Sequence, residues 1–90
     1  MSVSIELLDR LKASQDNASD YRVAQLLGVK QQTVSCYRRG MAPLSAEKVI
    51  VACDLAGLNS LEWLLRLQIE RAKGTAEKSI WNDALHRLAA

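Results

Sequence analysis

Side chains that can hydrogen-bond to nucleobases and phosphates gather in the run KQQTVSCYRR. Gln carries a donor and an acceptor on one rigid amide, so Gln31 and Gln32 can each bridge N6 and N7 of an adenine, which contributes about 1–3 kcal/mol of base discrimination. Lys30 can reach a guanine or a phosphate. Arg38 and Arg39, near the end of the run, suit backbone phosphates. The chemistry of this run therefore points to nucleic acid.

Two short helices that meet at a tight turn would position these side chains. Within residues 20–40, Ala24 is small enough for a close helix crossing, and Gly28 can take the positive φ that the turn needs. Val34 and Tyr37 lie three apart and would anchor the second helix to the body. This is the pattern of a helix-turn-helix. The first turn and outer face of the second helix can then enter a major groove, with Lys30, Gln31, Gln32, Ser35, Cys36, Arg38 and Arg39 exposed.

This segment resembles the helix-turn-helix of the Cro and lambda-repressor type of phage and bacterial transcriptional regulators. The resemblance covers residues 4–57, and its most specific part is AQLLGVKQQTVSCYRRG. There the family typically shows Ala, Gly, an apolar residue, a polar triplet, Val or Ile, Ser, a large apolar or aromatic residue and Gly. The resemblance implies a lambda-repressor-like four-helix core over residues 4–57 and operator binding through its second motif helix.

The predicted DNA contacts divide into base reading and phosphate binding. The family's usual base-reading pair falls on Gln31 and Gln32, and its next groove-facing positions fall on Ser35 and Cys36. Lys30 joins this base-reading set on chemical grounds. Phosphate contacts are expected from a helix start and from hydroxyl and basic side chains: Ser19, Arg22, Thr33, Arg38 and Arg39.

Positive charge is concentrated on the same segment. The chain has 12 Lys and Arg against 10 Asp and Glu, a net charge of +2. Residues 21–46 hold four basic and no acidic side chains, so the remainder has 8 basic and 10 acidic ones, a net of −2. Asp20 lies just outside this stretch, at a position where the family often carries a Gln or Thr that donates to a phosphate. A carboxylate cannot make that contact, so Asp20 departs from the family pattern.

The whole chain is predicted to be helical. Apolar residues recur at helical spacing in segments that end near Gly28, Gly40, Gly57 and Gly74, and no segment alternates as a strand does. We expect an all-α fold with one domain over residues 1–90, a compact bundle of five to six short helices. Caps are expected at Ser2 or Ser4, Ser19, Ser45 and Asn59.

The C-terminal helices, within residues 59–88, bear on self-association. In the first of them, the main apolar stripe is predicted to be Leu61, Leu64, Leu65, Ile69 and Ala72, which leaves Trp63 and Leu67 on a second face. Ninety residues bury only a modest core, and exposed aromatic surface tends to mark an interface. Either the last helix completes the core, or these helices form a homodimer interface with Trp63, Leu67, Ile80, Trp81 and Leu85. A dimer would read a palindrome with half-sites about 34 Å apart.

Other classes are not predicted. Charges interrupt the N-terminal apolar residues and the longest apolar run ends at Asp54, so neither a signal peptide nor a membrane span is expected. The sequence has no set of residues for catalysis, for a cofactor or for a metal, and Cys36 and Cys53 are not spaced as a site. A redox role for Cys36 is a minor alternative.

The expected function is that of a dimeric repressor that binds a palindromic operator in double-stranded DNA, in the cytoplasm of a bacterial cell. No small-molecule ligand is evident, and the chain is not expected to be an enzyme. The alternative is a small helical protein-interaction module that uses the C-terminal helices and has no specific DNA binding. Steep salt dependence and base selection would distinguish the first function from the second.

Overall fold

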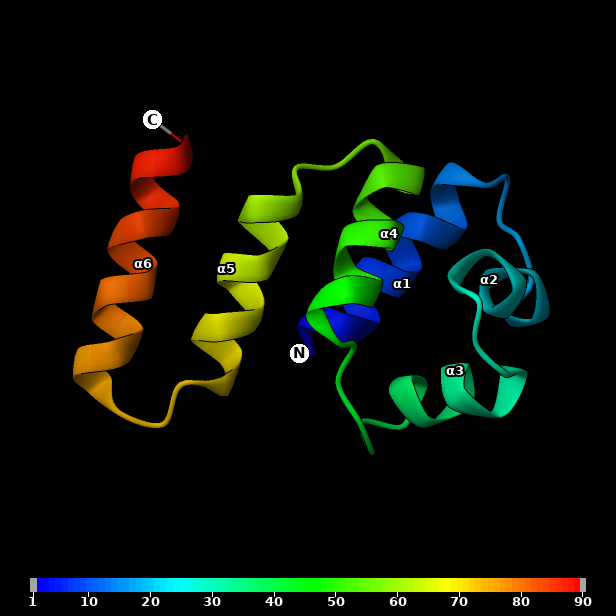
Figure 1. The fold of residues 1–90 in the computed structure, drawn as a ribbon, viewed down its shortest axis with the longest axis horizontal. Helices are drawn as coiled ribbons and strands as arrows, with labels where there is room; N and C mark the ends of the chain where they lie inside the picture. The colour runs from blue at the N-terminus through cyan, green and yellow to red at the C-terminus, as the bar shows by residue number, and fades with distance from the viewer. Residues whose placement is uncertain (1, 90) are drawn as a thin grey trace.

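The computed structural model describes residues 2–89, and these residues form six α-helices and no β-strand (Figure 1). The helices are α1 (Val3–Ser14), α2 (Asp20–Leu27), α3 (Gln31–Arg38), α4 (Ala46–Ala56), α5 (Ser60–Arg71) and α6 (Thr75–Ala89). The prediction of an all-α bundle is confirmed. None of these helices is both long and apolar enough to cross a bilayer.

Polar side chains cap four of the helix starts. Ser2, Ser19, Ser45 and Asn59 each accept a hydrogen bond from the backbone N–H three residues further on. Such caps typically stabilise a helix by about 0.5–2 kcal/mol. The sequence predicted the caps at Ser19, Ser45 and Asn59 and left the first open between Ser2 and Ser4; the structure shows that Ser2 caps α1. Ser4 is buried instead, and its hydroxyl accepts the Leu44 N–H at 2.9 Å, which holds the loop before α4 against α1.

The core is built by α1 to α5 around a central α1, which packs against each of the other four. Its buried side chains are Leu7, Leu8, Leu11, Val23, Ala24, Leu27, Val34, Tyr37, Leu44, Val49, Ala52, Cys53, Trp63 and Leu67. Burying one large aliphatic side chain contributes about 1.5–3 kcal/mol. The helices of the predicted four-helix core thus share one apolar interior, and α5 adds to it.

The prediction for the two faces of α5 was wrong. Trp63 is 1% exposed and Leu67 is 2% exposed, and both belong to the core, so they are not available for a dimer interface within this fold. Leu65 and Ala72 are buried outside that core cluster, on the opposite side of α5 by helical spacing. Leu61, placed on the inward stripe, is 53% exposed. Of the predicted stripe, Leu64 packs against the core, whereas the side of α5 that is buried in the core carries Trp63 and Leu67.

An ionic cluster on α5 reinforces its contact with α1. The guanidinium of Arg66 lies 4.8 Å from the centroid of the Trp63 ring. Its terminal nitrogens lie 3.4 Å from a carboxylate oxygen of Glu6 on α1 and 3.9 Å from one of Glu62. Cation–π contacts of this kind contribute about 0.5–1 kcal/mol at exposed sites. Arg66 thus covers the outer side of the buried indole.

The last helix forms an outer layer. Among residues 2–89, α6 packs only against α5, and none of its own residues is fully buried. Figure 1 shows α6 at one end of the long axis, with α2 and α3 toward the other end. The Cα atoms span 38 × 27 × 19 Å. The C-terminal helix thus covers the outer side of α5 and does not complete the main core.

Candidate nucleic-acid interface

The turn between α2 and α3 has the geometry that the sequence predicted. Gly28 adopts a φ of +70°, in the left-handed region. Its N–H donates to the Gln25 carbonyl at 3.2 Å, and the Val29 N–H donates to the Ala24 carbonyl at 3.0 Å. These bonds close the end of α2 and turn the chain directly into α3. Ala24 is buried beside the turn, in agreement with its predicted role as the small residue.

A lysine from α4 also holds this turn. The Lys48 Nζ donates to the Leu27 carbonyl at 2.9 Å, the last residue of α2. A cation at the C-terminal end of a helix interacts favourably with the helix dipole. This contact could not be predicted from the sequence, because Lys48 lies 21 residues from Leu27 along the chain. The only sequence signal was a basic residue in the first turn of α4, which has no obvious local partner.

The outer surface of α3 carries most of the predicted base-reading side chains. Val34 and Tyr37 are buried in the core and fix the inner face of the helix. Four predicted residues are exposed, namely Lys30, Gln31, Gln32 and Ser35. Cys36 and Thr33 are half-buried at the edges of that face. The fold therefore brings the two glutamine amides, a hydroxyl and an ammonium group to one polar surface, which we call the α3 face.

The first turn of α3 differs from the capped helix starts. Lys30 occupies the N-cap position and makes no side-chain capping hydrogen bond, whereas α1, α2, α4 and α5 have such a bond. The first N–H groups of a helix have no partner within the helix and carry its positive dipole end. This positive end lies beside Gln31 and Gln32 and favours an approaching anion.

The predicted phosphate-binding residues differ in their environments. The Ser19 hydroxyl accepts the Arg22 N–H at 3.2 Å and is therefore engaged as the α2 cap. Arg22 is exposed, and its Nη1 donates to Gln25 Oε1 at 3.3 Å, a contact on the surface that a phosphate can replace. Arg39, the residue after α3, is also exposed. Arg22 on α2 and Arg39 after α3 are therefore accessible cations.

Arg38 does not have the free guanidinium that was expected. Its side chain is 22% exposed, and its Nη1 hydrogen-bonds to Asp9 while its Nη2 lies 3.3 Å from Asp20 Oδ1. Burial alone would lower the pKa of Arg38, but the hydrogen bond to Asp9 and the charges of Asp20 and Asp9 outweigh it and raise that pKa. Both terminal nitrogens of Arg38 thus pair with carboxylates of the protein, which compete with the predicted phosphate contact. The unusual Asp20 has a partner within the protein.

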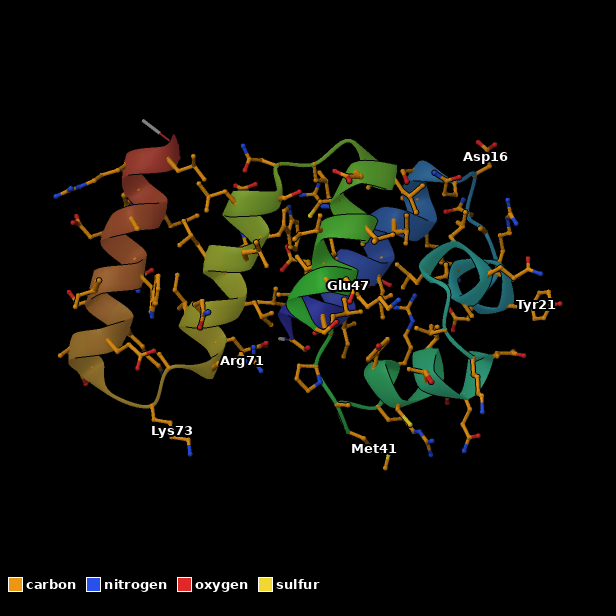
Figure 2. The ribbon with its side chains drawn as sticks, viewed as in Figure 1. Asp16, Tyr21, Met41, Glu47, Arg71 and Lys73 are labelled. Atoms are coloured by element: carbon orange, nitrogen blue, oxygen red, sulfur yellow. The ribbon has the colours of Figure 1, made fainter. Side chains whose placement is uncertain are left out.

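Two exposed apolar side chains lie at the start of α2 and just after α3. Tyr21 is 57% exposed in the first turn of α2, and Met41 is 68% exposed just after α3. Figure 2 shows both side chains pointing away from the body, with Met41 just past the C-terminal end of α3. The backbone fixes the position of Met41, whose N–H donates to the Cys36 carbonyl at 3.0 Å. Neither exposed side chain could be predicted from the sequence, because single exposed apolar residues have no periodic signature.

The second region of interest lies between α5 and α6. A shallow hollow of about 410 Å³ is lined by Val3, Arg66, Ile69, Glu70, Lys78, Asn82 and Leu85. Three predicted interface residues lie on α6: Ile80 is 68% exposed, whereas Trp81 and Leu85 are half-buried. The Trp81 Nε1 donates to Glu77 Oε2 at 3.1 Å. Of the predicted interface set, Ile80 is therefore the most accessible.

No group of three or more metal-ligating side chains occurs within residues 2–89. Both cysteines in this part of the chain are free: Cys36 is half-buried at the edge of the α3 face, and Cys53 lies in the core. Burial raises the pKa of the Cys53 thiol, with a further contribution from the nearby charge of Asp54. Cys53 is thus a neutral core residue.

The comparison with known proteins gives one partial relative. The chain is 44% identical over 45 residues to the "Uncharacterized protein Gp-c" of Pseudoalteromonas phage PM2. The match covers 50% of this chain and 49% of the phage protein, so it spans about half the length of each. No family model and no solved structure matches the chain.

Proposed function

We propose that this protein binds double-stranded DNA in a sequence-specific way and regulates transcription, with α3 as the helix that reads bases in the major groove. The observation that carries the proposal is the two-sided character of α3. Val34 and Tyr37 hold one side in the core, while Gln31, Gln32 and Ser35 are presented together on the other. An α-helix fits the major groove, and Gln can bridge the N6 and N7 positions of adenine.

The electrostatics around α3 support the same proposal. Residues 21–46 carry four basic and no acidic side chains. Of these cations, Lys30, Arg22 and Arg39 are exposed. Neutralising phosphates with such cations supplies most of the sequence-independent part of DNA affinity. We therefore assign base reading to Gln31 and Gln32, with Ser35, Cys36 and Lys30 beside them. Phosphate binding is assigned to Arg22 and Arg39.

Dimerisation belongs to the proposal, because one short helix reads only a few base pairs. With Trp63 and Leu67 in the core, the candidate contact is reduced to α6, where Ile80 is the most exposed large apolar residue. A dimeric repressor in the cytoplasm of a bacterial cell is the form that we favour. The partial match to a phage protein agrees with a phage or bacterial setting and says nothing about activity.

Two substitutions test the assignment of roles on α3. Replacement of Gln31 by Ala is expected to relax the preference at one base position of the site, at a cost of about 1–3 kcal/mol for the preferred sequence. Arg39→Gln is expected to weaken binding to all duplexes alike and to reduce the slope of log K against log salt by about one unit. The measurement is fluorescence anisotropy with selected and scrambled duplexes at several salt concentrations.

Matched controls lie on α5. Gln68 and Arg71 are exposed there, and Gln68→Ala and Arg71→Gln are expected to leave base preference and salt slope unchanged. If Gln31→Ala and Arg39→Gln bind DNA as these controls do, α3 is not the reading helix.

The second candidate is a protein-interaction module that uses the C-terminal helices. It is favoured by one observation, the exposed apolar side chains of Leu61 on α5 and Ile80 on α6. Under this function the salt slope of DNA binding is shallow and no base preference emerges, while Leu61→Asp and Ile80→Asp abolish capture of a partner protein. The anisotropy measurement therefore separates the two functions.

A further inference from the structure

We propose that Arg38 is a positioning residue for DNA reading: its guanidinium bridges Asp9 of α1 and Asp20 of α2 and thereby sets the orientation of α3. This inference rests on the proposed function, because it explains how the reading helix is held. It assigns Arg38 a task other than phosphate binding. It also gives a role to Asp20, the residue that departs from the family pattern.

The Arg38 bridge connects α3 to both helices that it packs against. Within residues 2–89, α3 packs only against α1 and α2. Arg38, the last residue of α3, pairs with one carboxylate from each of these two helices: Nη1 with Asp9 and Nη2 with Asp20, the latter at 3.3 Å. One side chain therefore joins all three helices at the C-terminal end of α3. The apolar anchors Val34 and Tyr37 lie earlier in the same helix.

The planar guanidinium of Arg38 gives the bridge a defined direction. Its nitrogens lie in one plane at fixed angles, so two carboxylates bound at two of them define the direction of the group. An ammonium group can supply the charge of Arg38 but not this planar fork. Val34 and Tyr37 fix the inner face of α3 through apolar contacts, which are non-directional. The bridge adds directional contacts at the C-terminal end of the helix.

The exposure of the two carboxylates limits how much the bridge contributes to folding stability. Exposed ion pairs add little to stability, and the carboxylates of Asp9 and Asp20 are 62% and 40% exposed. The bridge is therefore a weak source of folding stability. Base reading depends on side chains held at hydrogen-bonding distance, so a small rotation of α3 is costly for specificity even where stability barely changes. Arg38 therefore controls the orientation and the local opening of α3, and contributes little to the global stability of the fold.

The experiment compares Arg38→Lys with a control substitution at Arg71 on α5 and with Arg39→Gln at a proposed phosphate contact. Arg38→Lys keeps the charge and removes the fork, and it is expected to lower the ratio of specific to non-specific DNA affinity about tenfold or more, within the range that one mismatched base pair produces. The salt slope should stay unchanged. Arg71→Lys, at an exposed position on α5 outside the proposed interface, should change neither, whereas Arg39→Gln should reduce the salt slope without changing the ratio. Circular dichroism and thermal melting establish that each variant is folded.

The carboxylates provide a test of opposite sign. Asp9→Asn and Asp20→Asn each remove a negative charge, which by electrostatics alone raises affinity for every duplex equally. Positioning predicts that the ratio of specific to non-specific affinity falls in both variants, as it does in Arg38→Lys. An unchanged ratio in Arg38→Lys, Asp9→Asn and Asp20→Asn overturns the proposal. So does an Arg38→Gln variant whose salt slope drops by about one unit, since that marks a phosphate contact.

A readout without DNA separates this inference from the proposed function. Amide hydrogen exchange over α3 in the free protein is expected to be severalfold faster in Arg38→Lys and Asp20→Asn than in wild type, and unchanged in Arg39→Lys. If the wild type shows no base preference, the proposed function fails while this local result still stands. Equal exchange over α3 in Arg38→Lys, Asp20→Asn and wild type contradicts the bridge itself.

Discussion

Two neighbouring arginines illustrate what a residue's type leaves undecided. Arg38 and Arg39 have the same chemistry and were given the same phosphate-binding role from sequence. In the structure, Arg38 is 22% exposed and paired with Asp9 and Asp20, whereas Arg39 is exposed. Their difference arises because successive helical positions point about 100° apart and because both aspartates are distant along the chain. Only the tertiary packing of α3 on α1 and α2 separates the two roles.

At the residue scale, Trp63 provides a test of the core on α5. Trp63→Ala removes a side chain that is 1% exposed and should destabilise the protein by about 3–5 kcal/mol, since it leaves a cavity between α5 and the rest of the core. Ile80→Ala on α6 alters a side chain that is 68% exposed and should change stability little. Urea unfolding followed by tryptophan fluorescence for Ile80→Ala, and by circular dichroism for Trp63→Ala, gives both values. A small loss for Trp63→Ala would contradict its place in the core.

At the element scale, the turn between α2 and α3 has a matched pair of glycines. Gly28 has a φ of +70° and a Cβ there would lie 3.9 Å from Lys48 Nζ, an ordinary contact, so the cost of Gly28→Ala is backbone strain of about 1–2 kcal/mol. Gly74 lies outside the left-handed region and has open space, so Gly74→Ala should be neutral or slightly stabilising. Thermal denaturation measures the pair. Equal effects at the two sites would mean that the α2–α3 turn does not need its left-handed residue.

The helices themselves could be predicted largely from sequence, since caps and glycine stops are local signals. Ser19 and Gly28 bracket α2 as expected, and Val34 and Tyr37 face inward as their spacing required. The orientation of α5 could not be predicted in the same way. It has two apolar faces, and hydrophobic spacing does not say which face meets the core when a further helix covers the other. Trp63 was therefore assigned to the wrong side.

Contacts between distant residues form the other part that the sequence did not reveal. Lys48 reaches the end of α2, and Asp9 reaches the end of α3, across 21 and 29 residues of chain. In the sequence, each looks like any other charged residue on an amphipathic helix, because its partner is close only in the folded protein. The exposed base-reading candidates were easier, because an exposed polar residue on a helix with a defined buried face needs no distant partner.

At the scale of the whole molecule, the position of α6 alters the expected operator spacing. Figure 1 shows α3 in the half of the long axis away from α6. That axis measures 38 Å, and each α3 lies more than half of this length from the α6 end. Two copies joined end to end through α6 therefore hold their α3 helices more than 38 Å apart. One DNA turn is about 34 Å, and the next position on the same DNA face is two turns away.

An α6-mediated dimer therefore predicts half-sites about 20–21 bp apart, centre to centre. Footprinting of a selected operator measures this spacing, and Ile80→Asp should convert the dimer to a monomer in sedimentation. Half-sites about 10 bp apart, with a dimer that survives Ile80→Asp, would place the two-fold axis elsewhere on the molecule.

Whether α3 reads bases is tested by selection of bound duplexes from a random pool, carried out in parallel for wild type and Gln31→Ala. Wild type should enrich a short half-site, and Gln31→Ala should enrich the same half-site with one position relaxed. Enrichment of no sequence by the wild type, or an identical half-site from both proteins, would contradict base reading by α3.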